Sequence, residues 1–513
     1  MKRWIIGGSI VTVAIAGIIS SVLYRSHNQS NGVVSSHSQS DISSSVNLNS
    51  LSPIGTPTTS EKQQVFHKIW QLFNTYYPNF AMKGLDWSAE KSKYEPKAIN
   101  ASTWPQFFSI VNQMISDLND PHCSLIGAPM PTTYTPSVLT AWSNGQVVVV
   151  WSNDSSKIPV GSIVIGVDGA PVSVRLERSE YSKGYLEGAG QEALMTTSSS
   201  PEQISLWIPS SDQTRKVTVP VYPLTGSPAN NEVSELKNAA SSAWPIRPGW
   251  NYGLPITQGD MAFRITHLQD GILYVYIPAM EPPQSSENED ALTNEFERIL
   301  KLAQNSKGLI LDIRGNDGGI MWPGLWFARH LYKSDMEPAE VRFPTSQYLK
   351  LPQTLTSQDE ISIPLKPSTE KATPGFTKWG IMNISPLSPN LNIPVALLIN
   401  GWNASAAENF TVFMKAAPNV STFGSPTSGE DGSPRSFTVM KGVNVDISTW
   451  QERVMSTGFP IEGFGLAPDH PVFVSDSDLT KETIRSQQGD TQQTMKNDLV
   501  LQDALAWIIQ KNR

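Results

Sequence analysis

One serine stands where an acyl-transfer enzyme needs its nucleophile. Val395 to Ile399 is a continuous apolar run, typical of a strand buried on both faces. Ala404 to Ala417 is rich in alanine, with large apolar residues at helical spacing, and a proline follows. Ser405 therefore lies in the first turn of a helix, where free backbone N–H groups and the positive end of the helix dipole face its hydroxyl. A serine that only caps the helix fits the same pattern, so both interpretations stay open.

A glycine-rich loop follows a second apolar strand. The stretch GLILDIRGNDGG runs from Gly308 to Gly319 and ends in the pair Gly318 and Gly319. Paired glycines let the backbone approach a substrate closely, and their N–H groups can point at a developing oxyanion. A tight strand-to-helix turn would need the same residues.

Two further motifs carry groups that could move a proton. His122 lies in LNDPHCSL, directly after an expected helix, where it is either a base or a histidine that interacts with the helix dipole. Glu462 lies in IEGFGLAPD, where it is either a functional acid or a surface carboxylate in a turn.

Composition limits the classes of partner. A length of 513 residues suggests about three domains. The net charge of −8 and the pI near 5.5 argue against a nucleic-acid partner, because no basic field exists to hold phosphates. The single cysteine, Cys123, excludes an internal disulfide and a cysteine-based zinc site, and we interpret it as a small packed residue. We expect no cofactor and no metal.

The first residues predict export. Lys2 and Arg3 precede an uncharged stretch over 4–24, which in a helix would span about 30 Å, enough for a bilayer core. We therefore expect residues 1–25 to form an uncleaved signal anchor, with a cleaved signal peptide and a secreted protein as the alternative. Residues 26–60 are rich in Ser and Asn and predict a disordered tether. The remainder would then lie outside the cytoplasm, in the periplasm or at the cell surface.

The elements that must position these motifs fall into three parts. Residues 61–125 predict a helical domain, with a capping box of Ser60 and Gln63 and a second helix that follows Thr103. Residues 130–225 predict mostly strands, including a hairpin that turns at Asp168–Gly169. Residues 226–260 resemble a connection.

From residue 271, strands alternate with helices, which predicts an α/β layer on a largely parallel or mixed sheet. This core would span 226–513, with a proline-rich insertion at 334–392 near the active face and a last helix over 498–509 on the outside.

The four motifs in this order resemble the carboxyl-terminal processing (tail-specific) proteases. The motifs that carry the resemblance are LNDPHCSL, LILDIRGNDGG, NASAAE and EGFGLAPD. The resemblance runs from about residue 61 onward. It implies a crotonase-like ββα-spiral core, an N-terminal helical domain and a PDZ-like β domain around VGSIVIGVDGAPV, thus an α/β (α+β) multidomain fold. The PDZ-like domain would bind a substrate tail, gate the active site or be only structural.

The resemblance also implies roles for single residues. It makes Ser405 the nucleophile and assigns the oxyanion hole to the N–H groups of Ala406 and of Gly318 or Gly319. One branch of the family has a lysine base twenty-five residues after the serine, but here that position is Glu430. The tricorn-like branch uses a histidine and a glutamate, which match His122 and Glu462. We therefore expect a Ser–His–Glu arrangement, with His122 as base and Glu462 orienting it.

This chain departs from the tricorn-like pattern at Pro121, where those members tend to carry a serine. His470 is a rival base, though it lies in an expected outgoing strand, and Lys441 is too far along the chain for the lysine motif. The expected function is a membrane-tethered serine endopeptidase that acts on proteins or peptides. A non-catalytic binding protein on the same fold and an esterase-type acyl hydrolase are the alternatives.

Overall fold

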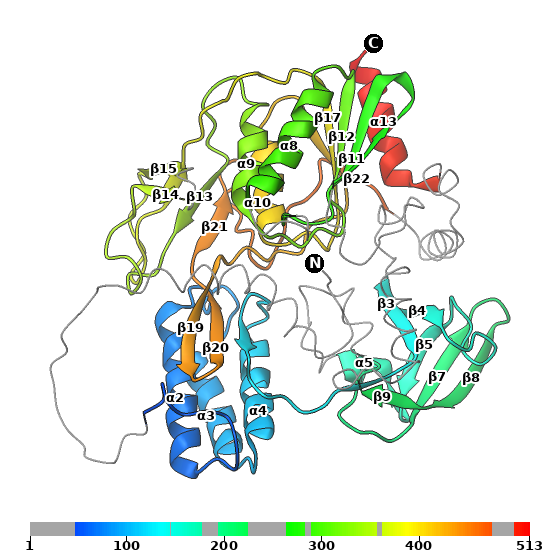
Figure 1. Cartoon of the computed structure of the whole chain (residues 1–513), viewed down its shortest axis with the longest axis vertical. Coiled ribbons are helices and arrows are strands. Elements are labelled where there is room, and N and C mark those ends of the chain that lie inside the picture. Colours follow the sequence, from blue (N-terminus) through cyan, green and yellow to red (C-terminus); the bar gives the residue numbers. More distant parts are fainter. Residues whose placement is uncertain are drawn as a thin grey trace.

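The computed structural model describes residues 47–143, 145–176, 193–223, 263–282, 289–356, 362–473 and 497–513. They form a mixed α/β fold of several parts (Figure 1). The expected anchor at 4–24 and the expected connection at 226–260 lie outside these residues. Among the described helices, none combines the length and apolar character that a membrane span requires.

Three helices form the part that precedes His122. They are α2 (Thr59–Tyr76), α3 (Trp87–Ile99) and α4 (Trp104–Ser116). Thr103 caps α4 as expected, but α2 is capped by Thr58 with Glu61, two residues before the expected pair Ser60 and Gln63. The sequence analysis did not find α3, because its apolar residues are few and a proline lies in its last turn. Leu51 accepts a hydrogen bond from Lys441 N–H, so the segment before α2 contacts the rest of the fold.

A three-stranded sheet joins these helices to the core. Its strands are β1 (Ser124–Ile126), β20 (Val443–Ser448) and β19 (Pro434–Met440), and all pairs are antiparallel. The β19–β20 hairpin extends from the core down beside α2 and α4 (Figure 1), and its apolar residues share one buried cluster with the helices. β1 begins two residues after His122 and pairs with β20. This pairing fixes the position of His122 relative to the segment that precedes β19.

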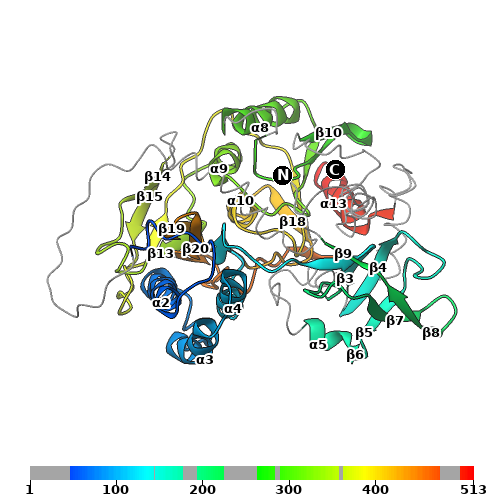
Figure 2. The same ribbon diagram turned by 60° about the horizontal axis from the view of Figure 1, so that its bottom comes forward.

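A separate group of strands carries its own small core. The strands are β2 (Tyr134–Pro136), β3 (Val138–Ser143), β4 (Gln146–Ser152), β5 (Ile163–Val167), β6 (Ala170–Pro171), β7 (Glu202–Ile208), β8 (Gln213–Val219) and β9 (Val221–Pro223), with helix α5 (Val172–Leu176). The expected turn at Asp168–Gly169 is confirmed, with φ of 51° and 79°. Figure 2 shows this group to one side of helices α2 to α4.

The core is a six-stranded sheet, in spatial order β10 (Arg264–His267), β11 (Ile272–Tyr276), β12 (Gly308–Asp312), β17 (Val395–Ile399), β18 (Val420–Gly424) and β22 (His470–Pro471). Every pair from β11 to β22 is parallel, so these strands end at one edge of the sheet. A short turn of 3-10 helix, η1 (Gln269–Gly271), precedes β11. The expected α/β layer is confirmed.

Helices cover both faces of this sheet, as a parallel sheet requires. On one face lie α8 (Glu289–Ala303), α9 (Met321–Arg329) and α10 (Ala406–Lys415), and on the other lies α13 (Leu499–Lys511) (Figure 1). Alternate residues of each strand therefore belong to two different buried clusters. Leu397 belongs to the cluster that includes residues of α8, α9 and α10, and Leu398 belongs to the cluster that includes residues of α13.

The expected insertion at 334–392 forms regular structure that its weak periodicity did not predict. It contributes β13 (Ala339–Arg342), β14 (Thr354–Thr356), β15 (Ser362–Pro367) and β16 (Gly380–Met382). These pair with one another, and β13 pairs with β21 (Gln451–Val454), which leads toward Glu462.

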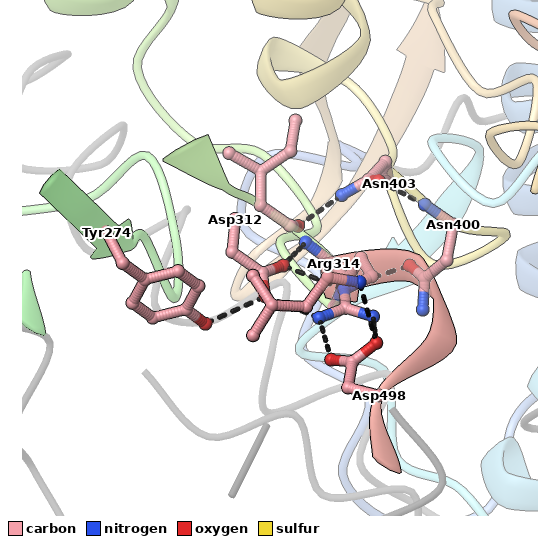
Figure 3. A network of polar contacts seen from close by, with 9 residues as sticks. Tyr274, Asp312, Arg314, Asn400, Asn403 and Asp498 are labelled. Carbon is pink, nitrogen blue, oxygen red and sulfur yellow. Dashed lines mark hydrogen bonds and ion pairs between the residues drawn. The ribbon is translucent and has the colours of Figure 1, made fainter. Parts of the chain in front are cut away.

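A buried arginine fixes the end of β12 to α13 (Figure 3). Arg314 makes bidentate contacts with Asp312 (2.9 and 2.6 Å) and with Asp498 (3.0 and 2.6 Å), and Asp498 also caps α13 through Leu501 N–H. Tyr274 donates to Asp312 Oδ2 at 2.8 Å. Because the three charged groups are buried, each needs the others, and the glycine loop after Arg314 leaves the sheet from a fixed point.

Candidate active site

Ser405 lies between β17 and α10 in a strained backbone conformation, with φ 54° and ψ −126°. Few residues other than glycine adopt positive φ, and such strain often accompanies functional sites. Its side chain makes no capping hydrogen bond, while its N–H donates to Glu430 O at 2.6 Å. Ser405 is the N-cap residue of α10 by position, but its side chain does not cap the helix. The hydroxyl remains available at the N-terminus of a helix, where developing negative charge is stabilised.

Two asparagines hold this turn against the glycine loop (Figure 3). Asn403 Oδ1 accepts from Asn400 N–H at 2.8 Å, and Asn403 Nδ2 donates to Asn316 O at 3.0 Å. Asn400 Oδ1 in turn accepts from Gly315 N–H at 3.0 Å. The ends of β12 and β17 are thus joined by side-chain amides. The sequence analysis missed this role, although asparagine directly after a buried strand was a visible signal.

The glycine loop lies directly against Ser405. A Cβ atom on Gly318 would stand 2.7 Å from Ser405 Cβ and 2.9 Å from Ala406 N. Gly318 and Gly319 have φ of 105° and 129°, values that favour glycine. Gly318 N–H already donates to Asn316 Oδ1 at 2.9 Å. Within the described residues, the N–H groups of Gly319 and Ala406 have no acceptor, so these two are free to bind an anionic oxygen.

Three consecutive residues bring the remaining candidates together. Glu430 O accepts from Ser405 N–H at 2.6 Å, Asp431 N–H donates to Glu462 Oε2 at 3.1 Å, and Gly432 N–H donates to His122 Nδ1 at 3.4 Å. Ser405, Glu462 and His122 come from distant parts of the chain. One loop, 427–432, therefore bonds to all three of them, and it is called the central loop below.

Glu408, in the first turn of α10, supports the central loop from inside the protein. It is fully buried and accepts from Thr427 Oγ1 at 2.5 Å, Gly429 N–H at 2.9 Å and Glu430 N–H at 2.6 Å. Burial raises the pKa of Glu408 to about 7, and these three bonds oppose the rise. The helix that begins at Ser405 thereby also holds the loop beside it. Sequence analysis gave Glu408 no role, although it lies in the quoted motif NASAAE.

The next residue of α10 contacts a pair of buried acids. Asn409 Nδ2 donates to Asp431 Oδ1 at 2.9 Å and to Glu452 Oε2 at 3.0 Å. Burial raises the pKa of Asp431 well above its ordinary value, and the charge of Glu452 raises it further. Two acids that repel in this way favour a state in which one of them is protonated.

His122 is held by its own turn and by the adjoining sheet. Its N–H donates to Asp120 Oδ1 at 3.1 Å, and Asp120 O accepts from Cys123 N–H at 2.9 Å. Its ring atom Nδ1 lies 3.9 Å from Asp120 Oδ1. Burial raises the pKa of Cys123, so its thiol stays neutral as a packed residue.

Glu462 is buried and pairs with a lysine that the sequence analysis did not consider. Its Oε1 lies 2.6 Å from Lys83 Nζ, and Lys83 Nζ also donates to Asn119 O at 2.8 Å. Burial raises the pKa of Glu462 to about 8, the charge of Asp120 adds to the rise, and Lys83 opposes it. The surface-carboxylate interpretation of Glu462 is wrong. Lys83 lies in the turn between α2 and α3, where no local pattern marks it.

The rival bases lie elsewhere. His470 stacks on Phe423 with ring centroids 4.4 Å apart, in β22 at the edge of the core sheet. Lys441 lies at the far turn of the β19–β20 hairpin, where its N–H donates to Leu51 O.

Two protein-family models match this chain, one over the core that carries Ser405 and one over the helices that precede His122. Residues 271–472 match the model of peptidase family S41, and residues 58–116 match that of the tricorn protease C1 domain. None of the curated proteins matches the chain.

Solved structures extend the likeness in fold to most of the chain. Mature CPAF is similar with a TM-score of 0.60 at 16% identity, over 87% of this chain and 98% of that one. Mature CPAF complexed with lactacystin is similar with a TM-score of 0.58 at 15% identity, over 86% and 99%. The family models lie on the core that carries Ser405 and on the helices before His122, and together with the fold they support a serine-type peptidase whose core is similar to peptidase family S41 and whose helices are similar to the tricorn C1 domain.

Proposed function

We propose that this peptidase is an endopeptidase that cleaves peptide bonds through an acyl-enzyme at Ser405, with His122 as base and Glu462 as its supporting carboxylate. The observation that carries the proposal is the central loop, whose residues Glu430 to Gly432 bond to the Ser405 backbone N–H and to the side chains of Glu462 and His122. The proposal follows the Ser–His–Glu branch of similar proteases and not the Ser–Lys branch, and its support is that Glu430 stands where the lysine would be.

In this mechanism His122 accepts the proton of Ser405 as Oγ attacks the substrate carbonyl. The oxygen of the tetrahedral intermediate becomes negative and binds the N–H groups of Gly319 and Ala406, assisted by the dipole of α10. His122 then gives its proton to the leaving amine. Water, activated by the same histidine, hydrolyses the acyl-enzyme and restores Ser405.

The finer architecture belongs to the same proposal. We assign the core sheet with α8, α9 and α10 to a crotonase-like ββα spiral, and the strands between 130 and 225 to a PDZ-like domain. Support for the second assignment comes from the β3–β4–β5–β7–β8 sheet with α5 packed against it. Substrates are then proteins or peptides, and no nucleic acid is involved.

The nucleophile is tested by Ser405→Ala. We expect it to abolish covalent labelling by a fluorophosphonate and to lower kcat/KM by about 10⁴-fold or more, as in other serine triads. Thermal unfolding should change little, because the hydroxyl makes no capping bond. Ser421→Ala, on the neighbouring strand β18, is the matched control and should label normally. Labelling of Ser405→Ala at the wild-type rate would exclude Ser405.

The glycine loop is tested by Gly318→Ala. The new methyl group would meet Ala404 O and Ser405 Cβ at 2.7 Å, so the loop must move away from Ser405 and carry the Gly319 N–H with it. Loss of one oxyanion donor typically lowers kcat by about 10²- to 10³-fold, and we expect a loss of this size. Gly375→Ala is the control, since that glycine also has positive φ but nothing within 4 Å of the added Cβ. A kcat of Gly318→Ala within threefold of wild type would contradict the assignment.

We also propose that residues 4–24 tether the peptidase to a membrane, with the catalytic part outside the cytoplasm. The support is the uncharged stretch that follows Lys2 and Arg3. Deletion of residues 1–46 should release the protein from the membrane fraction at alkaline pH, with activity on small peptides retained. Deletion of 26–46, which keeps the apolar stretch, should leave it in the membrane. Equal release of the full chain would show that no tether exists.

A further inference from the structure

A carboxylate other than Glu462 lies beside the imidazole of His122. Asp120 is 4% exposed, and its Oδ1 accepts the backbone N–H of His122 at 3.1 Å and stands 3.9 Å from Nδ1 of the ring. An aspartate that bonds to the N–H two residues on makes a stable local turn, so the distance between this carboxylate and the ring is set by adjacent residues. Its other oxygen, Oδ2, is buried and has no hydrogen-bond partner among the described residues.

The carboxylate of Glu462 is paired with the ammonium group of Lys83. The Lys83 side chain is 9% exposed and the Glu462 side chain 3%, and their 2.6 Å contact is a buried ion pair. Lys83 also holds Asn119 O at 2.8 Å, so the pair is connected to the turn that carries Asp120 and His122. A buried pair of this kind compensates its own charges and leaves less negative potential for a neighbour.

We infer that Asp120 is a positioning residue that orients His122, and that Glu462 acts on His122 through Lys83 and the turn from Asn119 to Cys123. The inference rests on the proposed function, in which His122 is the base. It divides between two acids the role that the sequence analysis gave to Glu462 alone.

The physical reason lies in the two nitrogens of the ring. Gly432 N–H donates to Nδ1 at 3.4 Å, and a neutral imidazole that accepts at Nδ1 carries its proton on Nε2. A base that acts through Nε2 needs the other tautomer, with the proton on Nδ1. A carboxylate 3.9 Å from Nδ1 favours that tautomer through its negative charge, which attracts the Nδ1–H dipole. The Gly432 amide and the Asp120 carboxylate therefore favour opposite tautomers of His122. Asp120 favours the tautomer with the proton on Nδ1, whose Nε2 can accept the serine proton.

Several other titratable groups lie around this turn. Tyr77 lies at the end of α2, where burial and then the charge of Asp120 raise its pKa, so it stays neutral. Lys83 keeps a raised pKa through Glu462 and Asp120 although burial opposes this, so it stays charged. Cys123 is neutral, and the central loop contributes the acids Glu430 and Asp431. Among these groups, the Asp120 carboxylate has its Oδ1 3.9 Å from Nδ1 of His122.

The test compares the pH profiles of kcat/KM for Asp120→Asn and the wild type on one peptide substrate. Asp120→Asn should lower kcat by about 10³- to 10⁴-fold, as loss of the orienting acid does in other serine triads, with little change in KM. Loss of the negative charge also lowers the pKa of His122, so the acid limb should move to lower pH. Asp117→Asn, at the end of α4 and paired with Lys93, is the matched control and should keep wild-type kinetics. An Asp120→Asn kcat within tenfold of wild type overturns the inference.

A charge-neutral double variant separates the two acids. Glu462→Gln leaves Lys83 as an unpaired buried charge, whereas Lys83→Met with Glu462→Gln removes both charges. The double variant should therefore regain at least tenfold in kcat over Glu462→Gln. A double variant as inactive as Glu462→Gln would show that His122 needs the Glu462 carboxylate itself, and would overturn the inference.

Two further variants keep the outcome unambiguous. Asp120→Glu keeps the charge but moves it by one methylene, so the acid limb should stay in place while kcat falls at least tenfold; an unchanged kcat contradicts the positioning role even if Asp120→Asn unfolds. His122→Ala is measured in parallel. A loss in His122→Ala without a loss in Asp120→Asn overturns only the role of Asp120, whereas wild-type activity in His122→Ala overturns the base assignment and with it the proposed function.

Discussion

The backbone of the central loop is the constraint on which the site depends. Its amides and one carbonyl bond to Ser405, Glu462 and His122 in consecutive steps, and backbone groups cannot be moved singly without moving the others. Glu408 accepts three donors of the same loop from within α10, the helix that Ser405 begins. The loop and Ser405 are therefore parts of one hydrogen-bonded unit. A preorganised unit of this kind loses little free energy to reorganisation when charge develops on the substrate.

His122, the proposed base, lies at the end of the helical part of the chain and contacts this unit. His122 lies between α4 and β1, and β1 pairs with β20 of the hairpin that follows the central loop. The Lys83–Glu462 ion pair makes a second connection between the two parts. The arrangement brings the region that matches the tricorn C1 domain, residues 58–116, next to the candidate active site. It also explains why a single buried cluster contains side chains of α2, α4 and the β19–β20 hairpin.

Features that depend on neighbouring residues, such as strand bounds and helix caps, could be predicted from the sequence. The apolar run Val395–Ile399 is strand β17 with the same bounds, and Thr103 caps α4 as its position suggested. The positions of Ser405, His122 and Glu462 also followed from short motifs, and the structure brings them to one loop. The cap of α2 was misassigned because Thr58, Ser60, Glu61 and Gln63 offer two capping boxes in nearly the same place.

What escaped the sequence analysis depends on contacts between distant residues. Nothing near Lys83 indicates a buried lysine, since its partner Glu462 lies in another part of the chain. The sheet of β13 to β16 was missed because its strands are short, β15 contains two prolines, and the sheet needs β21 to complete it. Glu408 and Asn409 resemble surface residues of a helix until the central loop covers them.

The central claim is that Ser405 and His122 act as one catalytic unit held by the central loop. The most direct test is a double-mutant cycle on kcat/KM with Ser405→Ala, His122→Ala and the combined variant. Residues that act as a unit are strongly non-additive, so each single variant should lose about 10⁴-fold or more and the combined variant should be little worse. Losses that multiply in the combined variant would show that the two residues act independently, and would contradict this account of the site.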